Sequence, residues 1–294
     1  MKPYIEFKKQ RDLGEILSDT FGFLRHEFKP FFRTVFTIAG PALFVFVVTL
    51  ALYNYVIGDS FDFGLSSMGY NQFNGFTIFI VLIIYLIAAI AAYILLISSA
   101  LHYIKSYIQN KGETNIKEIR QDVMRTFWGF LGLSILKGIT IFLAILICVL
   151  PVFYAMIPMA VVFSIYVFET RQSATDAYSK SFNLVNQDFW IAFGAFIILG
   201  ILFYIINMVF SLPAVIYTYA KMGVFSGEID PSSFDTLVDP VYIFLNVLSQ
   251  IVQYLLNLIL VIGGAVIYFH LNEKKNFTGT YERISEIGEN NNTI

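Results

Sequence analysis

Charged residues are scarce in this sequence of 294 residues. Asp, Glu, Lys and Arg make up 14% of the chain, whereas a soluble domain usually contains about 25%. Hydrophobic residues make up 57% and the mean hydropathy is +0.70, which is more apolar side chain than a water-soluble globule of this length can bury. The composition therefore excludes a soluble enzyme, a disordered chain and a basic protein with a nucleic-acid partner. It indicates a polytopic membrane protein.

The residue types that build disulfides and metal sites are also few. Cys148 is the only cysteine, so no intramolecular disulfide can form, and its place in an apolar run favours a small buried hydrophobe. The three histidines, His26, His102 and His270, lack the spacing of metal ligands. The chain contains no glycine-rich phosphate loop and no nucleophile-elbow motif. We therefore predict a protein that is not an enzyme and that has no cofactor or metal.

Long apolar runs predict six transmembrane helices. A helix needs about 20 apolar residues to cross a bilayer. A run over 127–168 contains Pro151 and Pro158, and it is long enough for two short crossings with a turn near Pro151. The other four runs cover residues 33–57, 76–104, 189–218 and 241–271. The sequence thus predicts an all-α polytopic membrane protein with its six transmembrane helices in three hairpins.

Lysine and arginine are distributed unevenly about these spans. Seven lie before or at the first span, five between the second and third, two between the fourth and fifth, and three after the last. Only Lys137, within the third span, and Lys221 fall elsewhere, and the loops at 58–75 and 219–240 are acidic. Since basic residues favour the cytoplasmic side, both termini are expected in the cytoplasm of a bacterial inner membrane. The first 30 residues also lack a secretory signal.

Residues 12–28 predict an amphipathic helix before the first span. Asp12 and Glu15 have the spacing of a capping box. The polar face is predicted to carry Ser18, Asp19, Arg25 and Glu27. The apolar stripe consists of Leu13, Ile16, Leu17, Thr20, Phe21, Leu24 and Phe28.

The same pattern recurs further along the chain. It reappears 161 residues later with Ser173 and Asp176 in the capping positions, and more weakly 103 residues later with Asn115 and Glu118. We interpret this as an internal repeat over approximately 12–108, 115–170 and 173–271. The alternative is that any amphipathic helix shows this spacing by construction. The repeats would form a single membrane domain over 1–272, followed by a short cytoplasmic tail, 273–294, that is partly disordered.

A pair of aromatic residues follows each amphipathic segment, where the next crossing begins. The pairs are Phe31-Phe32, Phe127-Trp128 and Phe189-Trp190. Aromatic rings favour the headgroup level of a membrane, so we expect each amphipathic helix to lie in the cytoplasmic interface. The predicted anchors are these six residues together with Phe21, Phe28 and Phe182.

The segment SATDAYSKSFNLVNQDFW at 173–190 resembles the signature of a bacterial family with six spans. This family is the membrane domain that precedes the catalytic barrel in some glycerophosphodiester phosphodiesterases, together with stand-alone relatives of unknown function. The resemblance rests on Ala177, Ser181, Phe182, Leu184 and Val185, which lead into Phe189-Trp190. It implies membrane association of unknown purpose. The tail after residue 271 is 23 residues long, so we expect no phosphodiesterase barrel and do not carry that activity over.

Polar residues inside the predicted spans are the main chemical signal. Four amides on the last span share one helical face because they are three or four residues apart, and Asn207 and Lys137 lie within the fifth and third spans. Such groups face protein or water rather than lipid. They predict either a polar cavity between these spans or interhelical hydrogen bonds. The four amides are Asn246, Gln250, Gln253 and Asn257.

Two further features concern packing within the spans. Lys137 lies close to the cytoplasmic interface if the repeats align, so either the second hairpin is tilted and crosses incompletely or this lysine snorkels to the surface. Gly263-Gly264 in the last span predicts close helix packing.

Two functions remain open at this level. The first is a non-enzymatic scaffold, assembly or envelope-homeostasis protein that acts through the lipid bilayer and other membrane proteins. The alternative is a transporter or channel for a small polar or lipidic solute, which would use the amide face of the last span.

Overall fold

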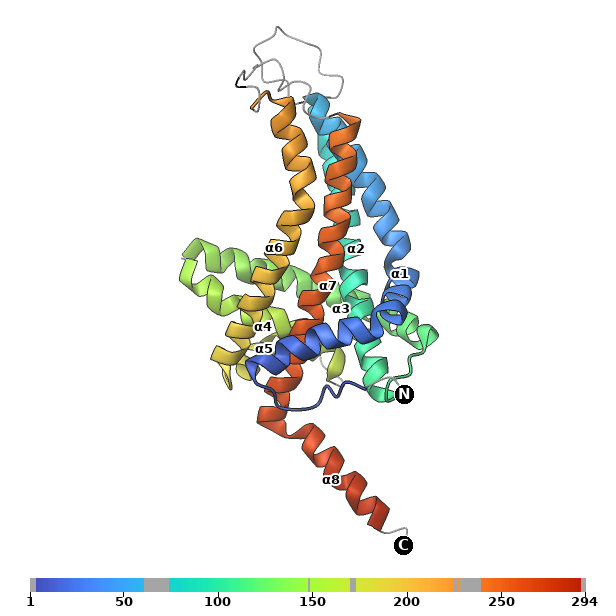
Figure 1. The fold of residues 1–294 in the computed structure, drawn as a ribbon, viewed down its shortest axis with the longest axis vertical. Coiled ribbons are helices and arrows are strands. Elements are labelled where there is room, and N and C mark those ends of the chain that lie inside the picture. The colour runs from blue at the N-terminus through green and yellow to red at the C-terminus, as the bar shows by residue number, and fades with distance from the viewer. Residues whose placement is uncertain are drawn as a thin grey trace. The chain divides into compact units, whose positions relative to one another are not determined.

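The computed structural model describes residues 4–60, 74–147, 149–169, 173–224, 227 and 239–291. Within these residues the chain is helical apart from short connections, and it contains no strand. Figure 1 shows the helices along the chain. The predicted all-α fold is therefore confirmed. Cys148, Arg171 and most of the two acidic loops lie outside the described residues.

Six helices are long and apolar enough to cross a membrane, as the sequence predicts. Two shorter helices accompany them, α5 (Ala174–Val185) and α8 (Thr278–Asn291). The six long helices are α1 (Leu13–Ser60), α2 (Gly75–Gln109), α3 (Ile116–Ile147), α4 (Val149–Phe168), α6 (Phe189–Lys221) and α7 (Pro240–Asn276).

The long helices extend beyond the predicted spans. The segment at 12–28 is not a separate helix but continues into the first span as α1, and the segment after Asn115 continues in the same way into α3. Only the third such segment, α5, is separated from the next helix. Residues 288–291, within the tail that is expected to be partly disordered, are helical and belong to α8.

Polar side chains cap the helix starts that the sequence indicates. The amide of Glu15 donates to Asp12 Oδ1 at 2.7 Å, and the amide of Asp12 donates to Glu15 Oε2 at 3.1 Å. Ser173 and Asp176 form the same reciprocal box at the start of α5. At α3, Asn115 Oδ1 accepts from the amide of Lys117 at 3.1 Å. These bonds satisfy amides that have no partner within the helix.

The chain forms two compact units that cut across the long helices. The first unit comprises Met1–Ile38, Ile94–Leu202 and Leu258–Ile294, and the second comprises Ala39–Tyr93 and Phe203–Asn257. This division does not follow the predicted repeats, so the internal repeat stays a prediction.

Aromatic rings form much of the core of the first unit. Phe23 lies 5.3 Å from Phe7 and from Tyr107, and Phe31 lies 5.2 Å from Tyr103, between ring centroids. Phe31 is fully buried. It therefore cannot act as the lipid-facing anchor that the sequence predicts, because the protein itself covers its ring.

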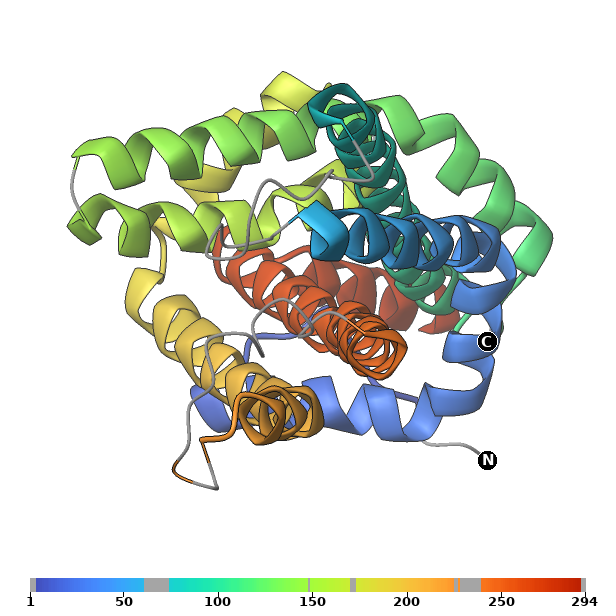
Figure 2. The same cartoon turned by 90° about the horizontal axis from the view of Figure 1, so that it is seen from above.

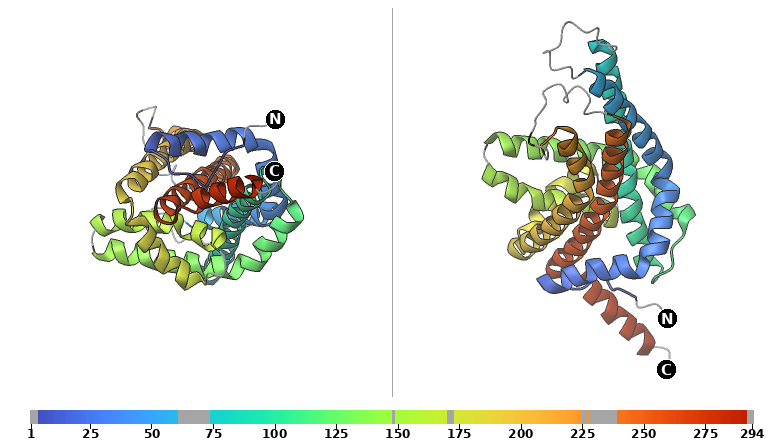
Figure 3. Two further views of the ribbon diagram at one scale, coloured as in Figure 1. Left: turned by 90° about the horizontal axis from the view of Figure 1, so that it is seen from below. Right: turned by 45° about the horizontal axis from the view of Figure 1, so that its top comes forward.

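Helices approach closely at the two glycines of α7. A Cβ atom at Gly264 would lie 2.9 Å from the carbonyl oxygen of Ala160 in α4, and one at Gly263 would overlap Leu199 of α6. Figure 3 shows the first turns of α1 crossing this end of α7. The predicted close packing at Gly263-Gly264 is confirmed, because neither position has room for a side chain.

The second hairpin also belongs to the first unit. Figure 2 shows α3 and α4 side by side, and α5 packs against both. Lys137 Nζ lies 5.4 Å from the ring centroid of Phe163, which joins α3 to α4 through a cation–π contact.

In the second unit, α1, α2 and α7 share a core. Phe46 and Leu50 of α1 pack on Ala92 of α2. Tyr254 of α7 lies 4.5 Å from Phe46 between ring centroids, and its hydroxyl donates to the carbonyl of Ala89 at 3.3 Å. Because this core covers one face of α7, it determines which face of α7 can lie against α6.

Candidate functional site

A groove of about 540 Å³ lies between α6 and α7 in the second unit. Its wall combines amides and hydroxyls with a few apolar side chains. The lining residues are Asn207, Ser211, Ala214, Val215, Thr218, Tyr219 and Met222 of α6, and Tyr242, Asn246, Ser249, Gln250 and Gln253 of α7.

Four amide side chains from the predicted polar set meet at this groove. Asn246, Gln250 and Gln253 occupy one face of α7 because they are four and three residues apart. Asn207 faces them from α6, although 39 residues separate it from Asn246 in sequence. The sequence shows that the α7 amides share a face, and the structure adds that this face is turned toward α6.

These amides make no hydrogen bond to the described part of the chain, although neighbouring groups do. Ser249 Oγ donates to the carbonyl of Phe210 across the two helices at 3.1 Å and to that of Leu245 at 2.9 Å. The interhelical bond is therefore made by a serine and not by Asn207, Asn246 or Gln250. Each amide keeps a donor and an acceptor available to whatever fills the groove.

A carboxylate joins the ends of α6 and α7 beside the groove. Asp239 Oδ2 accepts from Lys221 Nζ at 2.7 Å and from the Tyr217 hydroxyl, and Oδ1 accepts from the amide of Tyr242 at 2.8 Å. Burial raises the pKa of Asp239, but these hydrogen bonds outweigh it and lower the pKa below 3.8. The carboxylate and the ammonium neutralise each other, so the groove itself is lined by uncharged groups.

The two remaining residues of the predicted polar set lie elsewhere. Asn257 is on α7, one turn beyond Gln253, and does not line the groove. Lys137 belongs to the first unit, where its contact is the ring of Phe163.

The predicted anchors differ widely in exposure. Trp128 and Trp190 are 75% and 77% exposed, and Phe28 is 55% exposed. These three rings are available to lipid, in contrast to the buried Phe31 discussed above. Five others are partly buried: Phe21, Phe32, Phe127, Phe182 and Phe189.

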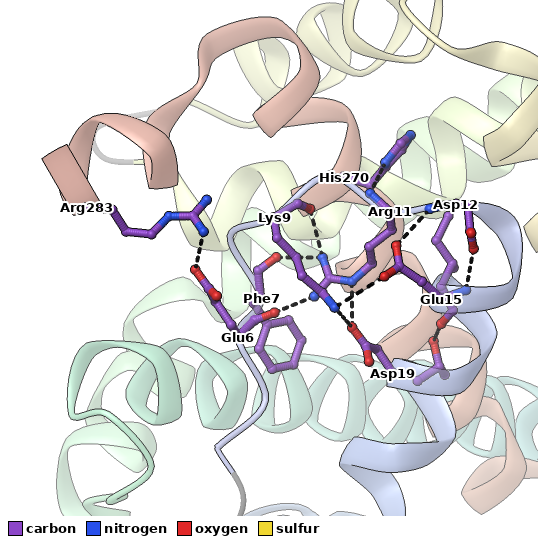
Figure 4. Close-up of polar contacts among 11 residues, drawn as sticks. Glu6, Phe7, Lys9, Arg11, Asp12, Glu15, Asp19, His270 and Arg283 are labelled. Carbon is purple, nitrogen blue, oxygen red and sulfur yellow. Dashed lines mark hydrogen bonds and ion pairs between the residues drawn. The ribbon is translucent and has the colours of Figure 1, made fainter.

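Sequence reasoning missed a polar cluster around the amino-terminal arm, which Figure 4 shows. The side chain of Arg11 is fully buried, donates to Asp19 at 2.9 Å and to the carbonyl of Phe7 at 2.7 Å, and reaches two more carbonyls of the arm. The amide of Arg11 donates to Nδ1 of His270 at 3.0 Å. Burial lowers the pKa of Arg11, and the Asp19 carboxylate opposes this change.

The cluster continues from His270 toward α6. His270 Nε2 lies 3.3 Å from Asp188 Oδ2, which also accepts from Lys274 at 2.6 Å. No local signal could have revealed these contacts, because Arg11 and His270 are 259 residues apart. The bonds fasten the amino-terminal arm to α7.

Two carboxylates of the first unit, Glu27 and Glu273, are buried. Glu27 was predicted on the polar face, but it is 5% exposed and accepts from the Tyr103 hydroxyl at 2.7 Å. Glu273 accepts from the amides of Gly279 at 2.7 Å and Thr280 at 2.9 Å, at the start of α8. The prediction for Glu27 is wrong because α2 covers the face of α1 centred on Phe23 and Phe31.

A hydroxyl, an imidazole and a carboxylate lie close together between α2 and α3. His102 Nε2 lies 3.0 Å from Thr126 Oγ1, and Nδ1 lies 3.7 Å from Asp122 Oδ2. Thr126 donates its single hydroxyl proton to the carbonyl of Asp122 at 2.8 Å. Thr126 is thus bonded to a carbonyl of its own helix, and its contact with His102 joins α3 to α2.

Among the described residues, no cluster of His, Cys, Asp and Glu side chains could hold a metal ion. Comparisons of the chain with protein-family models, with curated proteins and with solved structures find no match.

Proposed function

We propose that this protein is a non-enzymatic membrane protein that binds an uncharged amphipathic solute between α6 and α7, as a transporter or carrier of that solute. The observation that carries the proposal is the set of four amides that face one groove without a partner in the described chain. In a bilayer an unsatisfied amide is costly. Since the described chain offers them no partner, we infer that water or the polar part of a solute satisfies Asn207, Asn246, Gln250 and Gln253.

The lining favours a neutral solute with hydrogen-bonding groups. Amides both donate and accept, which suits hydroxyl, ester or amide groups. Among the described residues no charged side chain lines the groove, so an ion would gain little from them. Val215 and Met222 supply apolar contact, and about 540 Å³ falls within the usual range for small-molecule sites.

The predicted orientation indicates on which side of the membrane the groove lies. Its lining runs from Asn207 to Met222 on α6, toward the acidic connection between α6 and α7. If both termini are cytoplasmic, this end lies on the outer side of the membrane, and the groove would open to the outer leaflet. A reporter fused at residue 230 and one fused at either terminus should then report opposite compartments. The same compartment for both would overturn the orientation.

The binding proposal can be tested with diacylglycerol, an uncharged lipid with one free hydroxyl. Native mass spectrometry of protein released from nanodiscs containing diacylglycerol should show it bound to the wild type. The double variant Asn246→Leu/Gln250→Leu should retain at least about tenfold less diacylglycerol, because it lacks two of the amides that would bond the polar groups of this lipid.

Asn257→Leu is the matched control, because this amide is on the same helix but does not line the groove. It should retain diacylglycerol as the wild type does. Equal retention by the double variant, or an equal loss in Asn257→Leu, would contradict a site in the groove. Thermal unfolding of all three proteins shows whether any loss merely reflects misfolding.

A scaffold or assembly function is the second candidate, and the end of the second hairpin favours it. Leu146, Ile147 and Leu150 are exposed apolar residues where α3 meets α4. Lipid or another transmembrane helix must cover them. A photo-crosslinking residue at position 146 should give a reproducible protein adduct in membranes if this protein is a scaffold, and lipid adducts alone would count against it.

A further inference from the structure

Two parallel rows of side chains lie on the exposed side of α1, just before its apolar run. Arg25, Lys29 and Arg33 are spaced by four residues, and all three are exposed. Phe28, Phe32 and Phe36 follow the same spacing, three residues further along. Residues three and four apart are neighbours on a helix surface, so a basic row and an aromatic row run next to each other.

The aromatic row is continuous, and its two outer rings, Phe28 and Phe36, are exposed. The ring centroids of Phe28 and Phe32 are 4.7 Å apart, and those of Phe32 and Phe36 are 6.0 Å apart. Phe28 and Phe36 are 55% and 43% exposed. Such rings are stable at the headgroup level of a membrane, where one side is apolar and the other is wet.

The basic row has no acidic partner within the described part of the chain. Other basic residues of the first unit are paired there, for example Lys8 with Glu282, and Lys274 with Asp188. No carboxylate lies within ion-pair distance of Arg25, Lys29 or Arg33 among the described residues. These three charges therefore require a partner from outside the described chain or remain solvated.

The opposite side of the same helix is occupied by protein. Ile16, Phe23 and Phe31 are fully buried in the first unit. The face available to a membrane is thus the one that carries the two rows, and this differs from the apolar stripe that periodicity predicts. The rows also coincide with the start of the first apolar run at residue 33, which is the depth expected for lipid headgroups.

We propose that the face of α1 formed by these six residues binds the phosphate groups of anionic phospholipids. Guanidinium and ammonium groups form charge-assisted hydrogen bonds with phosphate oxygens. Three unpaired positive charges complement an anionic headgroup layer, and the adjacent rings occupy the boundary with the acyl chains. The occupant is a lipid rather than a free anion because the phenylalanine row requires an apolar neighbour.

The test measures lipid preference in nanodiscs that contain equal amounts of phosphatidylglycerol and phosphatidylcholine. Native mass spectrometry should find the anionic lipid enriched on the wild type. In the triple variant Arg25→Gln/Lys29→Gln/Arg33→Gln this enrichment should fall at least about fivefold, because each basic residue near an anionic surface contributes to the attraction. Inorganic phosphate added to the buffer should not displace the lipid, and displacement would contradict a lipid site.

A second triple variant controls for the loss of positive charge as such. Lys8→Gln/Lys180→Gln/Lys274→Gln removes three charges that are already paired with carboxylates, so lipid preference should be unchanged. The proposal is overturned if the α1 variant keeps the preference, or if the control loses as much. The single variant Lys29→Gln provides a milder test and should lose part of the enrichment. None of the three α1 side chains forms an ion pair with a described residue, so both α1 variants should melt like the wild type.

Discussion

Gly264 offers the sharpest test of how the first unit is packed. A Cβ at this position would lie 2.9 Å from the carbonyl oxygen of Ala160, whereas ordinary contacts begin at 3.4 Å. The atom that blocks it belongs to the backbone of α4, so no side-chain rotation can relieve the overlap. Gly200 on α6 is the matched control, because a Cβ there meets nothing within 4 Å.

The magnitude follows from two opposing effects. Replacing a helical glycine by alanine contributes about 1 kcal/mol of helix stability at either position. At Gly264 the overlap of about half an ångström forces α4 and α7 apart, and overpacking of this kind costs about 1–3 kcal/mol. The propensity contribution is common to both variants. Gly264→Ala should therefore be less stable than Gly200→Ala by about 1–3 kcal/mol.

Thermal unfolding in detergent, followed by the intrinsic fluorescence of Trp128 and Trp190, measures this difference. For a chain of this size about 1 kcal/mol corresponds to a change of about 2–4 °C in Tm. Gly264→Ala should melt about 2–12 °C below Gly200→Ala. Equal melting temperatures would refute the reasoning, because they would mean that α4 and α7 do not meet at this carbonyl.

Two further predictions concern hydrogen bonds at helix starts. Ser173→Ala should increase hydrogen exchange in α5 about fivefold, since losing the cap costs about 1 kcal/mol, and the exposed Ser179→Ala should not; equal exchange in both would contradict the capping box. Asp239→Asn should melt below the wild type at neutral pH. Because the folded pKa of Asp239 is lowered, its contribution is present above the unfolded pKa near 3.8 and is lost as the pH falls below about 4. The difference in Tm between the two proteins should therefore shrink from about pH 6 to about pH 3, and a constant difference would contradict this coupling.

Features that depend on neighbours in sequence were predictable. Five apolar runs indicate six long helices, because each run can cross a bilayer and the run over 127–168 is long enough for two crossings. The reciprocal bonds of Ser173 with Asp176 and of Asp12 with Glu15 follow from their spacing. The spacing of Asn246, Gln250 and Gln253 likewise puts them on one face whatever surrounds the helix.

Features that depend on residues far apart in the sequence could not be predicted from the sequence. Periodicity predicts an apolar stripe on α1, but it does not show which face of α1 another helix covers. Glu27 and Phe31 were therefore predicted to be exposed, whereas both are buried. Similarly, no helix was predicted over 278–291, and the contacts of α8 include Glu273, which accepts from the amide of Gly279, and Lys8, which pairs with Glu282.

The sequence by itself therefore determined the class of molecule, its helices and the polar face of the last span, because these arise from local hydrogen bonding and from the cost of placing polar groups in lipid. Only the tertiary structure decided that Asn207 faces Gln250 across a groove, that Arg11 reaches His270, and that the basic row of α1 is left exposed. The physical reason is that the rotation of a helix about its own axis is set by the helices packed against it. The residues of a helix alone do not select this rotation, because several of its faces could be buried at nearly equal free energy.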